Sequence, residues 1–128
     1  MPPSEFTKPD TVLVVEDNDF IRMQIITFLQ GAGYTVVEAS DGNDALSKLD
    51  KAINIAIVDV RMEPMNGFDF IKRIGAEGFN IPVVLVTGDQ NNDLLERAGQ
   101  HSVSSVLLKP VQKDKLLNMV ARLLERGR

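Results

Sequence analysis

The chain has 128 residues, of which 44% are hydrophobic and 25% are charged, and its formal net charge is -4 at pH 7. This length is enough for one domain with a full hydrophobic core and too short for a second domain. Cysteine is absent and His101 is the single histidine, which excludes disulfides, thiol catalysis and metal sites built from His or Cys. Any bound metal must therefore use oxygen ligands. The negative charge gives no electrostatic reason to expect nucleic-acid binding.

The sequence shows neither a membrane-spanning stretch nor a signal peptide. No apolar stretch is long enough to cross a bilayer, and Met1 to Lys8 lack the basic start and apolar centre of a signal peptide. We therefore expect a cytoplasmic protein without membrane insertion. Residues 1–10 are predicted to form a flexible tail, and residues 11–128 a single domain. No DNA-binding domain is expected in this chain.

The first half of the domain alternates between short apolar strands and amphipathic helices. The run from Thr11 to Val15 predicts a buried strand, which ends in the acidic cluster at residues 16–19. The helix expected next is closed by Gly33, and its apolar residues recur at three- and four-residue steps: Ile21, Ile25, Phe28, Leu29 and Ala32. A strand over residues 34–39 and a short helix after the turn at residues 40–42 follow.

The central strand of the domain is predicted over residues 54–58. Its continuous Ile and Val content is typical of a strand buried on both faces of a parallel sheet. Asp59 ends this strand, because the Pro and Gly that follow at positions 64 and 67 cannot extend it. A helix opens at Asn66-Gly67, and Gly75 and Gly78 are predicted to stop it.

Two more strands and two more helices complete the chain. Residues 81–86 predict a strand that runs into Thr87, and residues 103–108 predict one that meets Lys109-Pro110. Between them, residues 89–99 predict a weakly amphipathic helix that should be the most loosely held. The final helix has one apolar stripe: Leu116, Leu117, Val120, Leu123 and Leu124.

This alternation predicts an α/β fold with a parallel sheet covered by helices on both faces. The carboxyl ends of parallel strands share one edge, where such sheets bind ligands. The residues that end four strands should therefore converge there: Glu16, Asp17, Asp59, Thr87 and Lys109. The carboxylates form a hard oxygen site suited to Mg2+, while the hydroxyl and the ammonium can hold oxygens of a phosphoryl group. Glycine-rich nucleotide-binding loops are absent from the sequence.

Helix capping is the alternative explanation for the acidic cluster after the first strand. In this explanation Asn18 or Asp17 caps the next helix by accepting backbone N–H bonds, and an acid such as Asp19 is favourable near the positive end of the helix. It does not account for Glu16 and Asp17 together, since adjacent acids after a buried strand repel each other unless a cation compensates. The pair therefore favours a cation site.

Five short motifs together resemble the receiver domains of bacterial response regulators, over nearly the whole chain. Each motif is weak alone, but their order and register make a strong signal: Val14-Val15-Glu16-Asp17-Asn18, Ile57-Val58-Asp59, Met62 with Gly67, Val86-Thr87-Gly88, and Leu108-Lys109-Pro110. The resemblance implies a doubly wound (βα)5 sheet with the flavodoxin-like strand order 2-1-3-4-5. It also implies a cis Lys109-Pro110 bond, which is accessible to X-Pro peptides.

The resemblance further implies a phosphorelay function in two-component signalling. Asp59 would accept a phosphoryl group from a histidine kinase or a histidine phosphotransfer protein, and the surface would then switch for a downstream partner. Mg2+ would be held by Glu16, Asp17, Asp59 and the main-chain carbonyl of Arg61. Lys109 would offset charge in the transition state, and Thr87 would bind the attached phosphoryl group. Such a domain is not a conventional enzyme but catalyses its own phosphorylation and dephosphorylation; here it would be a stand-alone receiver or a segment of a larger protein.

Two departures from the family pattern shape these expectations. The position four residues after Asp59, commonly Pro, is Glu63, with Pro64 next, so the loop is expected to be shaped differently. Three residues before Lys109 the family usually has Tyr or Phe, whereas this chain has Val106, which is too short for the usual aromatic switch. We therefore expect phosphorylation to be read out mainly through residues 87–99.

Three other functions fit this sequence less well than a phosphoreceiver. A degenerate receiver that only binds proteins would not need the complete set of acids, Thr and Lys. A phosphatase of the same sheet type often carries a second acid two residues after the first, where this chain has Arg61. A flavodoxin-like cofactor binder is poorly supported, because the chain has no Trp and one Tyr to stack on a flavin.

Overall fold

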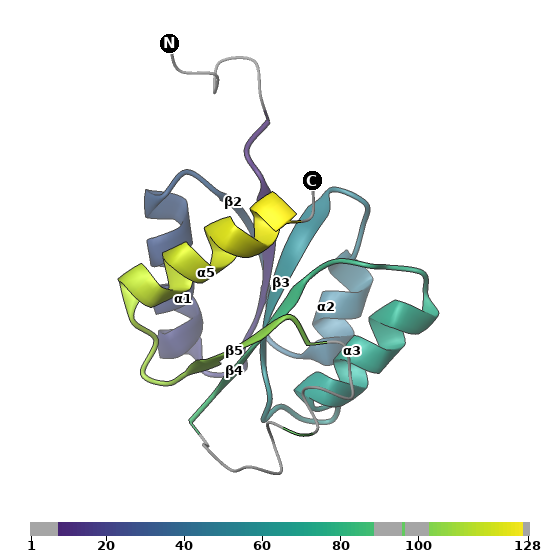
Figure 1. Cartoon of the computed structure of the whole chain (residues 1–128). Helices are drawn as coiled ribbons and strands as arrows, with labels where there is room; N and C mark the ends of the chain where they lie inside the picture. The colour runs from purple at the N-terminus through teal and green to yellow at the C-terminus, as the bar shows by residue number, and fades with distance from the viewer. Residues whose placement is uncertain (1–7, 89–95, 97–102, 127–128) are drawn as a thin grey trace.

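The computed structural model describes residues 8–88, 96 and 103–126, which contain a five-stranded parallel sheet with helices on both faces (Figure 1). The strands are β1 (Thr11–Val15), β2 (Thr35–Ala39), β3 (Ile53–Asp59), β4 (Val83–Thr87) and β5 (Ser105–Leu108). Their order is β2-β1-β3-β4-β5, and every neighbouring pair is parallel. The predicted fold class and strand order are therefore confirmed, with β3 in the centre.

Four helices cover the sheet in the described part of the chain: α1 (Asp19–Gly31), α2 (Gly42–Lys48), α3 (Gly67–Ala76) and α5 (Lys113–Arg126). Figure 1 shows α1 and α5 on one face of the sheet and α2 and α3 on the other. The helix predicted over 89–99 lies outside the described residues, Glu96 excepted, as do residues 1–7 of the predicted tail. Among the described helices, none combines the length and the apolar character needed to cross a bilayer.

The core consists of two layers, one on each face of the sheet, and β3 contributes to both. Ile55 and Ile57 pack in the layer under α1 and α5, while Ala56 and Val58 pack in the layer that includes α3. All four side chains are at most 1% exposed. Burial on both faces explains why this strand is apolar throughout instead of alternating.

Side-chain caps fix where the helices begin. Asn18 Oδ1 accepts the Ile21 N–H at 3.0 Å, so Asn18 caps α1 and the two acids before it are left for another role. Asn66 and Asp69 form a reciprocal capping box at the start of α3.

Four boundary predictions are wrong, one of them the strand predicted over residues 103–108, since β5 begins only at Ser105. α1 ends at Gly31, so Ala32 lies past the helix and is exposed instead of facing the core. α3 continues through Gly75, whose surroundings are open, and the chain turns only at Gly78, which has a φ of 88°. β4 begins at Val83 and not at residue 81, because Pro82 has no N–H to donate to the sheet.

Candidate functional site

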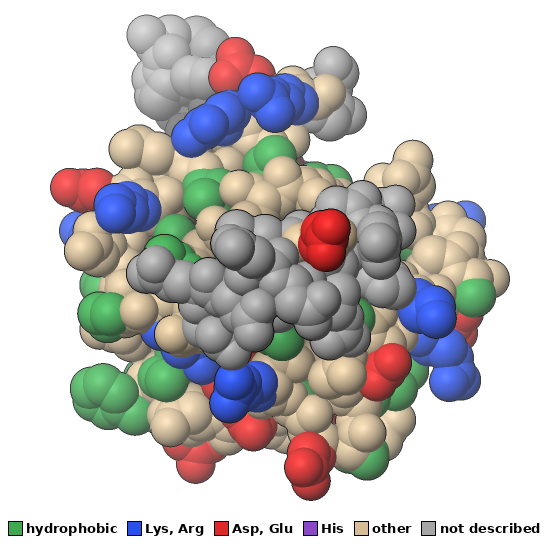
Figure 2. All heavy atoms as spheres, turned by 60° about the horizontal axis from the view of Figure 1, so that its bottom comes forward, with side chains coloured by type: hydrophobic (Ala, Val, Ile, Leu, Met, Phe, Trp, Pro, Cys, Tyr) green, Lys and Arg blue, Asp and Glu red, His purple; other side chains and the backbone are tan. Residues whose placement is uncertain are grey.

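The residues predicted to converge do lie at the carboxyl edge of the sheet, which Figure 2 brings toward the viewer and where acidic side chains gather along the lower rim. Glu16, Asp17 and Asp59 each place one carboxylate oxygen within 4.8 Å of the others. Glu16 and Asp59 are only 1% and 4% exposed, whereas Asp17 is exposed. The cluster therefore has two buried acids and one that faces solvent.

Lys109 is the basic side chain of this site. Its Nζ lies 3.1 Å from Glu16 Oε1 and 3.4 Å from Asp59 Oδ1. Its main-chain N–H donates to the carbonyl of Thr87 at 2.8 Å, which ties the ends of β4 and β5 together. Thr87 itself is 2% exposed. One ammonium thus faces two buried carboxylates.

The electrostatics of Glu16 reflect this imbalance. The pKa of the Glu16 carboxyl is raised to about 7, first by burial and then by its hydrogen bond with Asp59, while the Asn18 N–H and Lys109 act in the opposite direction. The Asn18 N–H donates to Oε2 at 3.1 Å. Oε1 accepts no aligned hydrogen bond from any described residue, although the Lys109 ammonium is near.

This donor set fits a divalent cation. A buried carboxylate oxygen without a hydrogen bond is costly, and a cation among the three acids would satisfy it. Oxygen ligands from carboxylates are the ones that Mg2+ prefers. The arrangement therefore meets the chemical requirement for Mg2+ with residues already in place.

The loop after β3 holds Asp59 and requires glycine at position 67. The Arg61 N–H donates to Asp59 Oδ1 at 3.3 Å, and the Gly67 N–H donates to the Val60 carbonyl at 2.9 Å. A Cβ on Gly67 would lie 2.7 Å from the Asp59 carbonyl oxygen and 3.1 Å from Val60 Cα. Only glycine lets α3 start this close to the acid.

Both X-Pro bonds near the site are cis: Lys109-Pro110, as predicted, and Glu63-Pro64 in the loop after Asp59. The latter coincides with the position where the sequence departs from the family pattern. That Arg61 offers its main-chain carbonyl to a metal stays a prediction.

One residue near the site was missed by sequence reasoning. Arg22 Nη1 donates to the carbonyl of Glu16 at 2.8 Å, although Arg22 lies one turn into α1. Its signal was the placement of Arg four residues after the N-cap Asn18, where a side chain can reach back to the preceding turn.

Comparison with known proteins agrees with this geometry. The family model for the response regulator receiver domain matches residues 12–121. The sensor histidine kinase RcsC of Salmonella typhi is 37% identical over 118 residues, which are 91% of this chain and 12% of the kinase. The transcriptional regulatory protein PdtaR of Mycobacterium tuberculosis is 33% identical over 123 residues, 94% of this chain and 59% of that protein.

Solved structures give the same result. The chemotaxis protein CheY4 of Vibrio cholerae superposes with a TM-score of 0.83 at 32% identity, covering 91% of this chain and 99% of that one. A response regulator receiver protein from Pseudomonas putida gives a TM-score of 0.83 at 33% identity, covering 91% and 98%. The chain spans less than two thirds of the curated relatives named above. It belongs to the response regulator receiver domain family, the receiver module of two-component systems.

Proposed function

We propose that this chain is a working phosphoreceiver, which takes a phosphoryl group from a phosphohistidine onto Asp59 in a Mg2+-dependent reaction and then switches its surface for a downstream protein. The observation that carries the proposal is the position of Asp59: buried at the end of the central strand, beside two further acids and 3.4 Å from the Lys109 ammonium. The donor would be a histidine kinase or a histidine phosphotransfer protein, in keeping with a relative named as a sensor histidine kinase.

The chemistry asked of these residues is a phosphoryl transfer between nitrogen and oxygen. A carboxylate oxygen of Asp59 forms the O–P bond while the P–N bond to the partner's histidine breaks, and the electron pair leaves on the imidazole nitrogen. Lys109 offsets the negative charge that approaches Asp59, and Thr87 can donate its hydroxyl to the attached phosphoryl group. Glu16, Asp17, Asp59 and the Arg61 carbonyl would hold Mg2+, which supplies further charge neutralisation at the phosphoryl oxygens.

The same site argues against a pure binding module. Burying Glu16 and Asp59 side by side with a single ammonium is unfavourable for folding. A module that only docks proteins would gain stability from losing one of these acids. Their joint presence is understandable where a cation and a phosphoryl group bind.

The test is incubation with a small phosphodonor and Mg2+, read by intact mass. Wild type should gain one phosphoryl group, and Asp59→Asn should gain none while remaining folded. Asp114→Asn, which changes an exposed acid in the first turn of α5, is the matched control and should label like wild type. Full labelling of Asp59→Asn would overturn the assignment.

The metal part of the proposal is tested separately. Asp17→Ala should weaken Mg2+ binding and slow labelling, and thermal stability in EDTA should hold or rise because an acid has left the cluster. If Mg2+ affinity is unchanged in this variant, Asp17 is not a ligand.

A further inference from the structure

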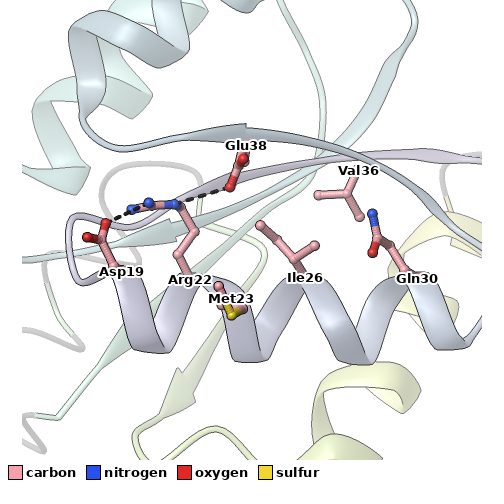
Figure 3. Close-up of a pocket in the computed structure, with 7 residues that line it drawn as sticks. All are labelled: Asp19, Arg22, Met23, Ile26, Gln30, Val36 and Glu38. Carbon is pink, nitrogen blue, oxygen red and sulfur yellow. Dashed lines mark hydrogen bonds and ion pairs between the residues drawn. The ribbon is translucent and has the colours of Figure 1, made fainter.

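Arg22 on α1 is bound on three sides by groups from three parts of the chain. Nη1 donates to the Glu16 carbonyl at 2.8 Å, Nη2 to Asp19 Oδ1 at 2.6 Å, and Nε to Glu38 Oε2 on β2 at 3.3 Å. Figure 3 shows the guanidinium lying between Asp19 and Glu38, with the dashed ion pairs on either side. The fixed planar fork of Arg makes three such bonds possible at once.

The three bonds differ in what they can contribute. The Asp19 and Glu38 side chains are 89% and 60% exposed, so these ion pairs are screened by water and add little stability. The Arg22 side chain is only 16% exposed, and its bond to the Glu16 carbonyl is partly buried. The exposed acids therefore serve mainly to aim the guanidinium at that carbonyl.

That carbonyl belongs to the peptide group that joins Glu16 to Asp17. The same turn is held at the Glu16 N–H, which donates to the Ala39 carbonyl on β2 at 3.1 Å. With the peptide groups on both sides of Glu16 held, the direction of the Glu16 Cα–Cβ bond is fixed, and so is the position of the Asp17 Cα that follows. Glu16 and Asp17 are two of the three acids that meet within 4.8 Å.

We infer that Arg22 is a positioning residue of the acidic site, which orients Glu16 and Asp17 toward a common cation by holding the peptide between them. In this role Arg22 would act only through Glu16 and Asp17, without binding the cation or the phosphoryl group itself. The inference rests on the proposed function for its consequence, Mg2+ affinity, while the fixing of the turn is a property of the metal-free protein.

The experiment compares Arg22→Met and Arg22→Lys with Arg73→Met, which removes the same charge from the last turn of α3 on the other face of the sheet. Mg2+ affinity is measured by calorimetry. In EDTA, NMR relaxation gives the backbone order parameters of Asp17 and Asn18, and thermal unfolding gives the melting temperature. Losing a group that orients metal ligands typically weakens metal binding on the order of 10-fold. We expect that loss in both Arg22 variants, with lowered order parameters at residues 17 and 18 and no change in Arg73→Met.

Lys keeps the charge but cannot reproduce the fork, so Arg22→Lys separates orientation from charge. Equal Mg2+ affinity in wild type and both Arg22 variants would overturn the inference, even if the melting temperature falls, since a merely structural role predicts that fall alone. If wild type binds no Mg2+, the proposed function fails, and the positioning role is decided by the order parameters of Asp17 and Asn18 alone. Values in the Arg22 variants equal to those of wild type overturn the positioning role, and lower values support it. Should Arg22→Met fail to fold, Glu38→Gln is the replacement variant, since it removes the ion pair that holds Arg22 Nε. For the inference to stand, this variant must also lower the order parameters of Asp17 and Asn18.

Discussion

Replacing Glu16 with Gln should make the metal-free protein more stable at alkaline pH, although it removes a buried group of the proposed site. Burial and the hydrogen bond with Asp59 raise the pKa of this carboxyl from 4.5 to about 7 in the folded protein. A carboxyl whose folded pKa lies above its unfolded value contributes stability below pH 4.5 and loses that contribution as the pH rises through 7. Gln keeps the shape of the neutral carboxyl and cannot ionise.

The size of the effect follows from the two pKa values. Each unit of difference in pKa corresponds to about 1.4 kcal/mol, so ionising Glu16 in the folded site costs at most about 3.5 kcal/mol by pH 8. The difference in unfolding free energy between Glu16→Gln and wild type should therefore grow by about 1 to 3 kcal/mol from pH 5 to pH 8 in EDTA.

Urea denaturation at several pH values measures this difference, with Glu125→Gln on the exposed side of α5 as the control. Saturating Mg2+ should reverse the order at pH 8, because metal binding requires the ionised carboxylate and displaces its proton. A difference that stays constant between pH 5 and pH 8 in EDTA would refute the reasoning, since Glu16 would then titrate alike in the folded and unfolded chains.

Two further predictions concern the loop after Asp59 and the readout. Gly67→Ala should lower the unfolding free energy, measured by urea denaturation, by about 1 to 3 kcal/mol, because the added Cβ meets backbone atoms of Asp59 and Val60. Gly75→Ala, in a helix and with open space around it, should raise the unfolding free energy by about 0.5 to 1 kcal/mol. Equal effects of the two substitutions would contradict the close approach at Gly67. With a beryllofluoride mimic of the phosphoryl group, amide shifts should change most over residues 87–99 and less over 103–108 and 114–125, and the opposite pattern would show that Val106 does not limit the switch.

The sheet was predictable from sequence because its signals are local and agree with one another. The runs at residues 11–15 and 54–58 are too short and too rich in Val and Ile for helices, and both became buried strands. Convergence of Glu16, Asp59, Thr87 and Lys109 followed from topology alone, since parallel strands end at one edge. The wrong boundaries, at Ala32, Gly75 and residues 81 and 103, depend on where individual backbone hydrogen bonds stop, which composition specifies weakly.

The role of Arg22 and the burial of Glu16 were not predictable in the same way. Nothing in the pattern distinguishes Glu16, at 1% exposed, from its exposed neighbour Asp17. The distinction arises from the direction of the turn after β1. That direction is set by two hydrogen bonds at Glu16: its carbonyl accepts from Arg22 on α1, and its N–H donates to Ala39 on β2. The spacing of Arg22 from Asn18 is a weak signal of the first bond, but neither hydrophobic periodicity nor composition reveals which of the two acids is buried.

The packing around Asp59 also determines where a phosphoryl group could exert its effect. The residues before it on β3 are buried on both faces, and Val60 N–H is bound to the Val86 carbonyl at 3.1 Å, so the main chain at Asp59 has no room to move. Thr87 and Lys109 end strands nearer the edge of the sheet and are joined by one backbone hydrogen bond of 2.8 Å. If Thr87 moved toward a phosphoryl group on Asp59, the ends of β4 and β5 would therefore move together, while the main chain at Asp59 would stay in place. If Asp59 is phosphorylated as proposed, its firmly held main chain and the paired strand ends beside it would convert a local change of charge into a change of surface.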